Sequence, residues 1–133
     1  MAIDMTDPRL LFPKGASRLD EKTIAIRNEK ILEAACKKAV WKRDEGICRC
    51  CGTKVIKALE LTPKRAESHH IVGRADWAVR FDPRNRVLVC AVCHEAIERN
   101  RILIVGTARQ MFTAENGKSY LNADCPLEFR KAA

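Results

Sequence analysis

Two Cys-x-x-Cys pairs constrain this 133-residue chain more than any other feature of its sequence. Cys48 and Cys51 form the first pair, in "CRCC", and Cys90 and Cys93 form the second, in "CAVC", 39 residues beyond Cys51. A gap of two residues lets a tight turn present two thiolates to one ion, and zinc accepts four such ligands in a tetrahedron. The spacing therefore predicts one structural zinc site built from both pairs.

Burial in an apolar core is the alternative interpretation of these cysteines, since free cysteine is often fully buried. Two correctly spaced pairs favour zinc. Cys50 is ambiguous, because it could replace a neighbour as a ligand or stand beside the site. Cys36, on a predicted helix, and Cys125, before Pro126, are expected in the core. A closed four-thiolate site explains folding and leaves any chemistry unexplained.

The charge of the chain indicates a polyanionic partner. Twenty-five Lys and Arg against 17 Asp and Glu give a formal charge of +8, which favours nucleic acid. No apolar run approaches the roughly 20 residues that a membrane span needs, and no signal-peptide core follows the N-terminus. Seven cysteines in such a chain indicate metal ligands rather than disulfides. We therefore expect a cytoplasmic protein that binds no membrane.

Local patterns predict an α+β fold. Residues 1–19 lack periodicity and are expected to form an irregular arm, and one domain is expected over 20–133. Apolar residues at helical spacing predict a helix over about 20–43, which Gly46 would end. The rest of the chain is expected to contain extended segments over 54–72, a strand at 86–90, a helix at 93–100 and a hairpin over about 102–124 that turns at Asn116–Gly117.

All three histidines lie near the second cysteine pair. His69 and His70 are adjacent, and His94 directly follows Cys93. On a strand, adjacent side chains point to opposite faces, so His69 and His70 cannot easily serve the same ion. One of them could bind a metal while the other is left for proton transfer.

These residues resemble the HNH endonuclease family. Its ββα-metal motif has a strand ending in His or Asp followed by His, then a loop with Asn, a second strand, and a helix with the last His. The landmarks here are His70, Asn85 and His94. "HHIVGR" is similar to the first strand and its exit, "NRVLVCAVCH" to the second strand and helix start, and "RDEGICRCCG" to the zinc-knuckle lead-in of the cysteine-containing branch. The similarity covers residues 43–101, the motif core, which is under half of the chain.

The resemblance implies a small zinc-stabilised, treble-clef-like ββα-metal domain with an N-terminal helix and a C-terminal β-hairpin. It also implies a metal-dependent DNA endonuclease that leaves a 5′-phosphate and a 3′-hydroxyl. His69 and His94 would bind the catalytic divalent ion, Mg²⁺, Mn²⁺, Ni²⁺ or Zn²⁺. His70 would be the general base, and Asn85 would hold the loop that orients it. Glu98 stands where some members have a further His, and could reach the ion or remain a solvated helix charge.

The loop between the two expected strands supports a DNA partner, expected to be double-stranded. Its arginines outnumber its acidic residues, and guanidinium groups suit bidentate phosphate contacts. Trp77 could stack on a base or anchor the loop in the core, and anchoring is the preferred interpretation. The arginines expected to contact DNA are Arg74, Arg80, Arg84 and Arg86.

Two other functions fit parts of the pattern. One is a non-catalytic, zinc-ribbon-like module that binds nucleic acid, which leaves His69, His70, Asn85 and His94 without a common purpose. The other is a structural adaptor of a larger DNA-processing complex. A bacterial or phage-encoded protein is expected from the resemblance, and sequence specificity and oligomeric state stay open.

Overall fold

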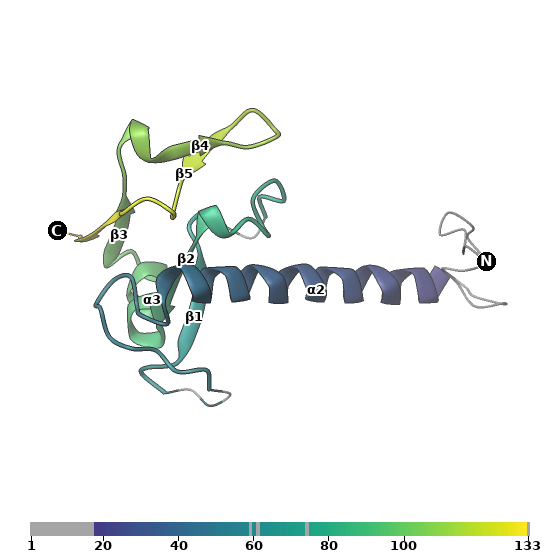
Figure 1. Ribbon diagram of the computed structural model, residues 1–133, viewed down its shortest axis with the longest axis horizontal. Coiled ribbons are helices and arrows are strands. Elements are labelled where there is room, and N and C mark those ends of the chain that lie inside the picture. The colour runs from purple at the N-terminus through teal and green to yellow at the C-terminus, as the bar shows by residue number, and fades with distance from the viewer. Residues whose placement is uncertain (1–17, 59, 61, 74, 133) are drawn as a thin grey trace. The chain divides into compact units, whose positions relative to one another are not determined.

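The computed structural model describes residues 18–58, 60, 62–73 and 75–132 (Figure 1). Most of the arm expected over 1–19, and the expected DNA contact Arg74, lie outside them. The chain divides into two compact units, 1–34 and 35–133.

The described part is a small α+β fold, as predicted. Its helices and strands are α2 (Arg18–Asp44), β1 (Ala66–His70), β2 (Arg86–Cys90), α3 (Ala91–Glu98), β3 (Ile102–Val105), β4 (Met111–Thr113), β5 (Ser119–Leu121) and β6 (Glu128–Lys131), with short 3₁₀ turns η1 (Pro83–Asn85) and η2 (Ala108–Gln110).

Helix α2 begins in the first unit and ends in the second. In the first unit its apolar residues Ile26, Ile31 and Leu32 are exposed. In the second unit Cys36 and Val40 are buried in the core. No helix in the described part of the chain is both long and apolar enough to cross a lipid bilayer.

The end of α2 follows from a glycine, as the sequence predicts. Gly46 has φ of +66°, a conformation that L side chains rarely adopt, and its N–H donates to the Trp41 carbonyl at 3.2 Å. A Cβ at this position would lie 2.9 Å from the Trp41 ring. Any other residue would therefore have to displace Trp41 as well as adopt a strained backbone.

The centre of the second unit is a β-hairpin followed by a helix. Strands β1 and β2 pair antiparallel, with His69 opposite Val87 and His70 opposite Arg86. Helix α3 follows β2 without a break and packs against both strands. Every residue of β2 is buried, since the core lies on both of its faces. This is the predicted ββα arrangement, and the helix begins two residues earlier than expected.

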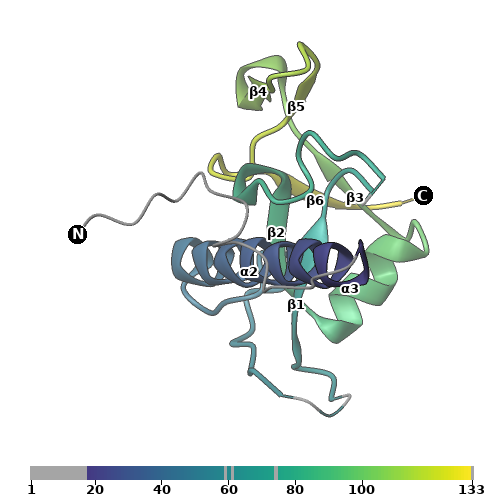
Figure 2. The ribbon, with the colours of Figure 1, turned by 90° about the vertical axis from the view of Figure 1, so that its right-hand side faces the viewer.

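The C-terminal region contains the predicted hairpin in a narrower range. Strands β4 and β5 pair around a turn in which Gly117 has φ of +80°, so the expected turn at Asn116–Gly117 is confirmed. Strand β3, which the sequence placed in the same hairpin, instead pairs antiparallel with β6, beyond the expected end at residue 124 (Figure 2). The β4–β5 hairpin is thus an insertion between two strands that pair with each other.

Candidate functional site

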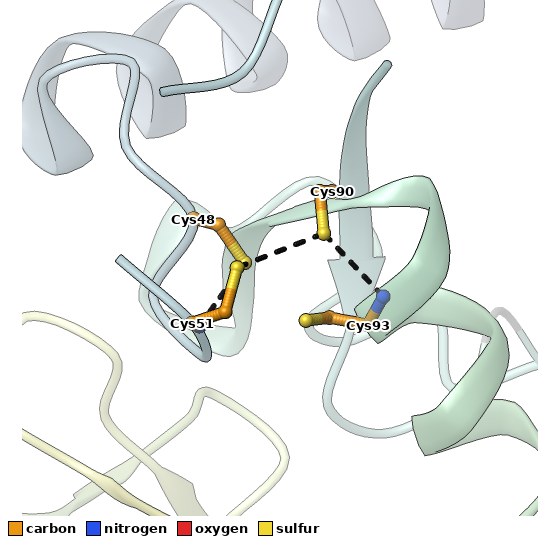
Figure 3. A group of neighbouring side chains, drawn as sticks. All are labelled: Cys48, Cys51, Cys90 and Cys93. Atoms are coloured by element: carbon orange, nitrogen blue, oxygen red, sulfur yellow. Dashed lines mark hydrogen bonds between the residues drawn. The ribbon is translucent and has the colours of Figure 1, made fainter. Parts of the chain in front are cut away.

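The four paired cysteines meet at one point (Figure 3). Cys48 and Cys51 lie on the turn after α2, Cys90 ends β2, and Cys93 lies in the first turn of α3. Their sulfur atoms all lie within 4.8 Å of one another. Backbone N–H groups point at sulfur in both halves: Cys51 donates to Cys48 Sγ and Cys93 donates to Cys90 Sγ, each at 3.5 Å. Four converging sulfur donors fit a tetrahedral structural zinc ion.

Local chemistry gives these thiols different proton affinities. Burial raises the pKa of Cys48 and of Cys93. Cys51 is exposed, and its hydrogen bond with the Thr53 hydroxyl, at 3.2 Å, lowers its pKa to about 6. Zinc binds thiolates, so the buried cysteines must release protons when the ion binds.

The other three cysteines lie outside this four-sulfur group. Cys36 is buried in the core, as predicted. Cys50 packs beside the core and contributes no sulfur to the group, which favours its interpretation as a bystander. Cys125 is only partly buried and belongs to neither core cluster found among the described residues, so its expected core position was wrong.

A second group of possible metal ligands joins β1 to α3. His69 on the strand, and His94 and Glu98 one turn apart on the helix, bring donor atoms within 4.8 Å of one another. Glu98 Oε1 lies 3.5 Å from His69 Nδ1 and 3.2 Å from His94 Nε2. Two imidazoles and a carboxylate suit a divalent metal ion. His69 is buried whereas the Glu98 side chain is 61% exposed, so the group opens to solvent on the helix side.

Burial sets the protonation state of His69. Desolvation, aided by the nearby His94, lowers the pKa of His69 from 6.5 to about 4. Its Nδ1 is buried and makes no hydrogen bond. His69 is therefore neutral near pH 7, which is the form that binds metal.

His70 and Asn85 lie beside this group without belonging to it. His70 follows His69 on β1 and so projects from the opposite face of the strand. Asn85 is 1% exposed, and it accepts from the two residues after His70: Ile71 N–H reaches its carbonyl at 2.9 Å and Val72 N–H its Oδ1 at 3.0 Å. Asn85 thereby fixes the backbone where the chain leaves β1.

The three described arginines of the loop differ in their surroundings. The guanidinium of Arg80 lies over the Trp77 ring. Arg84 pairs with Asp82 at 2.8 Å and lies over Phe112. Arg86 is 0% exposed, and its Nη2 donates to the Arg80 carbonyl at 2.6 Å. Its burial leaves no surface for a phosphate, so Arg86 supports the loop from within.

Trp77 does not anchor the loop, and that prediction was wrong. Its side chain is 60% exposed. Val79, two residues on, is buried instead, in a small second core with Phe112 and Tyr120 of the β4–β5 hairpin. The hairpin supplies the apolar partners of this loop, which periodicity within the loop itself could not reveal.

A buried ion network that the sequence did not indicate connects these parts. Asp44, at the end of α2, accepts from Arg43 at 2.8 Å, from Arg49 at 3.0 Å and from the Leu88 backbone N–H at 3.0 Å. The same arginines donate to backbone carbonyls of η1, β2 and the C-terminal segment. A charged "KRDE" run at a helix end is typical of a solvated terminus. Only the fold shows that Asp44 within it is buried.

Comparison with known proteins agrees with this geometry. Residues 48–100 match the HNH endonuclease family model, and the matched segment contains both groups of possible metal ligands. It spans less than half of the chain. Searches of curated proteins and of solved structures found no match. A match to this family implies metal-dependent, nuclease-type function. The resemblance predicted from the sequence is thus confirmed as a match of residues 48–100 to the HNH endonuclease family model.

Proposed function

We propose that this chain is a metal-dependent DNA endonuclease that hydrolyses phosphodiester bonds. The observation that carries the proposal is the convergence of His69, His94 and Glu98, from a strand and a helix, beside His70 within a segment that matches the HNH family. The formal charge of +8 favours a polyanionic substrate, and we take double-stranded DNA as that substrate.

In the proposed mechanism, His69, His94 and Glu98 hold a divalent ion, Mg²⁺, Mn²⁺, Ni²⁺ or Zn²⁺. When bound, the ion supplies Lewis-acid stabilisation of the charge that builds on the phosphate and on the departing oxygen. His69 is suited to this role because its lowered pKa keeps it neutral. The cysteine cluster takes no part in the reaction, since a site with four protein thiolates has no open position for substrate.

His70 is the proposed general base. It accepts a proton from water as the water oxygen attacks phosphorus, since neutral imidazole is an effective base near physiological pH. The bond from phosphorus to the 3′ oxygen breaks and that oxygen takes a proton from solvent, which leaves a 5′-phosphate and a 3′-hydroxyl. Asn85 is a positioning residue, because its hydrogen bonds to Ile71 and Val72 fix the backbone directly after His70.

Arg74, Arg80 and Arg84 are the proposed phosphate contacts. Arg84 is already paired with Asp82, so a phosphate must share or displace that carboxylate. Arg80 has no carboxylate partner among the described residues, which makes it the stronger candidate of the two that the structure describes. Contacts of this kind position DNA without reading its sequence.

Cleavage of supercoiled plasmid tests the proposal. Protein carrying one equivalent of zinc should convert the plasmid to nicked or linear forms only after Mg²⁺, Mn²⁺, Ni²⁺ or further Zn²⁺ is added. Glu98→Gln should require more metal for half-maximal cleavage, because it removes one charged ligand. Glu95→Gln is the matched control: Glu95 lies on the same helix and pairs with Arg99 at 3.0 Å, away from the ligand group.

Two results would contradict the proposal and select between the other functions. DNA binding without cleavage in any of these metals would indicate a non-catalytic binding module. Absence of both cleavage and salt-sensitive DNA binding would indicate a structural adaptor.

A further inference from the structure

The loop between β1 and η1 exposes an aromatic side chain that nothing in the proposed reaction uses. We propose that Trp77 and Arg80 form a stacking surface for an unpaired nucleobase. DNA with an unpaired base near the cleaved bond would then be preferred over a continuous duplex. This inference rests on the proposed nuclease function and names the class of DNA that the site accepts.

The aromatic cluster lies on the surface and carries positive charge. Trp77 is 60% exposed and meets Phe81 edge-on, with ring centroids 6.3 Å apart. The Arg80 guanidinium lies 4.3 Å from the centre of the Trp77 ring and 5.5 Å from that of Phe81. Exposed aromatic rings combined with arginine are the usual means by which proteins hold unpaired bases.

Other residues hold this loop in place. Val79 is buried against Phe112 and Tyr120 on the β4–β5 hairpin. The Tyr120 hydroxyl donates to Asp76 Oδ2 at 2.7 Å, directly before Trp77 in the chain. The loop is thus fixed on both sides of Trp77, while Trp77 itself stays mostly exposed. A ring presented by an already fixed loop loses little conformational freedom when a ligand binds.

The charges around the cluster favour an anionic ligand. Asp76 is engaged by Tyr120, and Asp82 is engaged by Arg84 at 2.8 Å. Within the described part of the chain, no carboxylate pairs with the Arg80 guanidinium, whose charge faces aromatic rings instead. Asp82 is therefore paired with a cation and Asp76 keeps its charge, while Arg80, without a carboxylate partner in the described part of the chain, leaves positive charge beside Trp77 for a nucleotide.

The cluster also lies within reach of the proposed active site. Asn85 holds Val72, two residues after His70, at 3.0 Å. Trp77 follows His70 by seven residues, which span at most about 25 Å even when fully extended. That length corresponds to about seven nucleotide steps along one DNA strand. A base on Trp77 would thus belong to the region around the scissile phosphate.

Stacking requires an unpaired base because a duplex hides the flat faces of its bases. In paired DNA each base stacks between its neighbours and offers only its edges to the grooves. A tryptophan ring can cover a base face only where a base has left the stack. The phosphate contact proposed for Arg80 needs no unpaired base, so the test must separate stacking on Trp77 from binding of the DNA backbone.

Binding to three matched duplexes tests the inference. One duplex is fully paired, the second has a single bulged nucleotide, and the third has an abasic residue in that bulge, which keeps the distorted backbone and removes the base. Anisotropy of labelled DNA is measured with the zinc-loaded full chain and no added catalytic metal. The unaltered protein should bind the base bulge about 5- to 100-fold more tightly than the other two.

Variants assign that preference to the ring. Trp77→Ala should bind all three duplexes with similar affinity, whereas Trp77→Phe should keep most of the preference. Leu103→Ala is the control, because Leu103 is another exposed apolar residue, on β3. It should behave like the unaltered protein.

Two outcomes would overturn the inference: equal affinity of the unaltered protein for the base and abasic bulges, or a preference that survives in Trp77→Ala. Plasmid cleavage measured in parallel keeps the two proposals distinct. Cleavage without a base preference overturns the stacking surface alone. A base preference without cleavage in any metal supports the stacking surface and contradicts the proposed nuclease function.

Discussion

The cysteine cluster (Cys48, Cys51, Cys90 and Cys93) and the histidine group (His69, His94 and Glu98) differ in how far the protein encloses each of them. Three of the four cysteines are buried, their donors are all sulfur, and one backbone N–H in each half points at a sulfur atom. In the histidine group only His69 is buried, and Glu98 is mostly exposed. A closed site suits a structural ion, and an open one leaves room for substrate. Their difference agrees with the proposal that the cysteines serve folding and that the group of His69, His94 and Glu98 serves chemistry.

The two sites are not independent, because helix α3 carries ligands of both. Cys93 and His94 are adjacent, so an ion at the cysteines fixes the start of the helix that presents His94 and Glu98. Loss of the structural ion should therefore disrupt the histidine group. Loss of a histidine should leave the cysteine site intact. The following predictions test this one-way dependence, beginning with the largest effect.

Cys90→Ser should abolish both zinc binding and compact structure. The free energy of zinc binding, about 10 kcal/mol or more, also drives the folding of small metal-dependent domains. Zinc content and circular dichroism check this prediction, and cleavage should be lost as well. Cys125→Ser, at a partly buried cysteine outside the cluster, is the control and should keep its zinc. A Cys90→Ser protein with native zinc content and native spectrum would refute the structural site.

Asp44→Asn should destabilise the fold by about 3–5 kcal/mol, because it leaves the charges of Arg43 and Arg49 without their buried partner. Urea denaturation measures the loss. Asp124→Asn is the matched control: Asp124 also pairs with Arg43, at 3.4 Å, but it is exposed, so its loss should cost below about 1 kcal/mol. A loss below about 1 kcal/mol in Asp44→Asn as well would show that this buried network contributes little to the fold.

The stability of the protein without catalytic metal should fall between pH 6.5 and about 4 because of His69. Over that range the unfolded chain holds a proton on His69 that the folded protein excludes, since burial lowers the folded pKa to about 4. The effect should reach about 3 kcal/mol at the acid end. The free energy of unfolding of His69→Gln, measured by urea denaturation, should depend less on pH than that of the unaltered protein. Any effect of pH on the cysteines is the same in both proteins. Identical pH profiles would mean that His69 is not held neutral.

The parts of the fold that depend on local chemistry could be predicted from the sequence. The cysteine spacing predicted the four-sulfur group, Gly46 predicted the end of α2, and Gly117 predicted the hairpin turn. Alternation along β1 predicted that His69 and His70 would not share one ligand group. Each of these inferences needs only neighbouring residues and backbone geometry.

The errors involve partners that are distant in the chain. Trp77 was expected to anchor its loop rather than to stack on a base, but Val79 is the buried residue, packed against Phe112 and Tyr120 of the hairpin. The pairing of β3 with β6 depends on strands separated by the whole β4–β5 insertion. Burial of Asp44 and Arg86 depends on the assembled core. Sequence periodicity carries no information about such contacts.

Cleavage of supercoiled DNA by His70→Ala and His94→Ala, across a range of added metal, tests the division of labour most directly. Both proteins should fold and keep zinc at the cysteines. His70→Ala should lose about 10²- to 10⁴-fold in rate at every metal concentration, because it lacks the proton acceptor. His94→Ala should recover partly as metal rises, because its defect is weaker ion binding. Recovery of His70→Ala with a persistently inactive His94→Ala would reverse the assigned roles, and full activity in both would contradict the assignment of cleavage to this site.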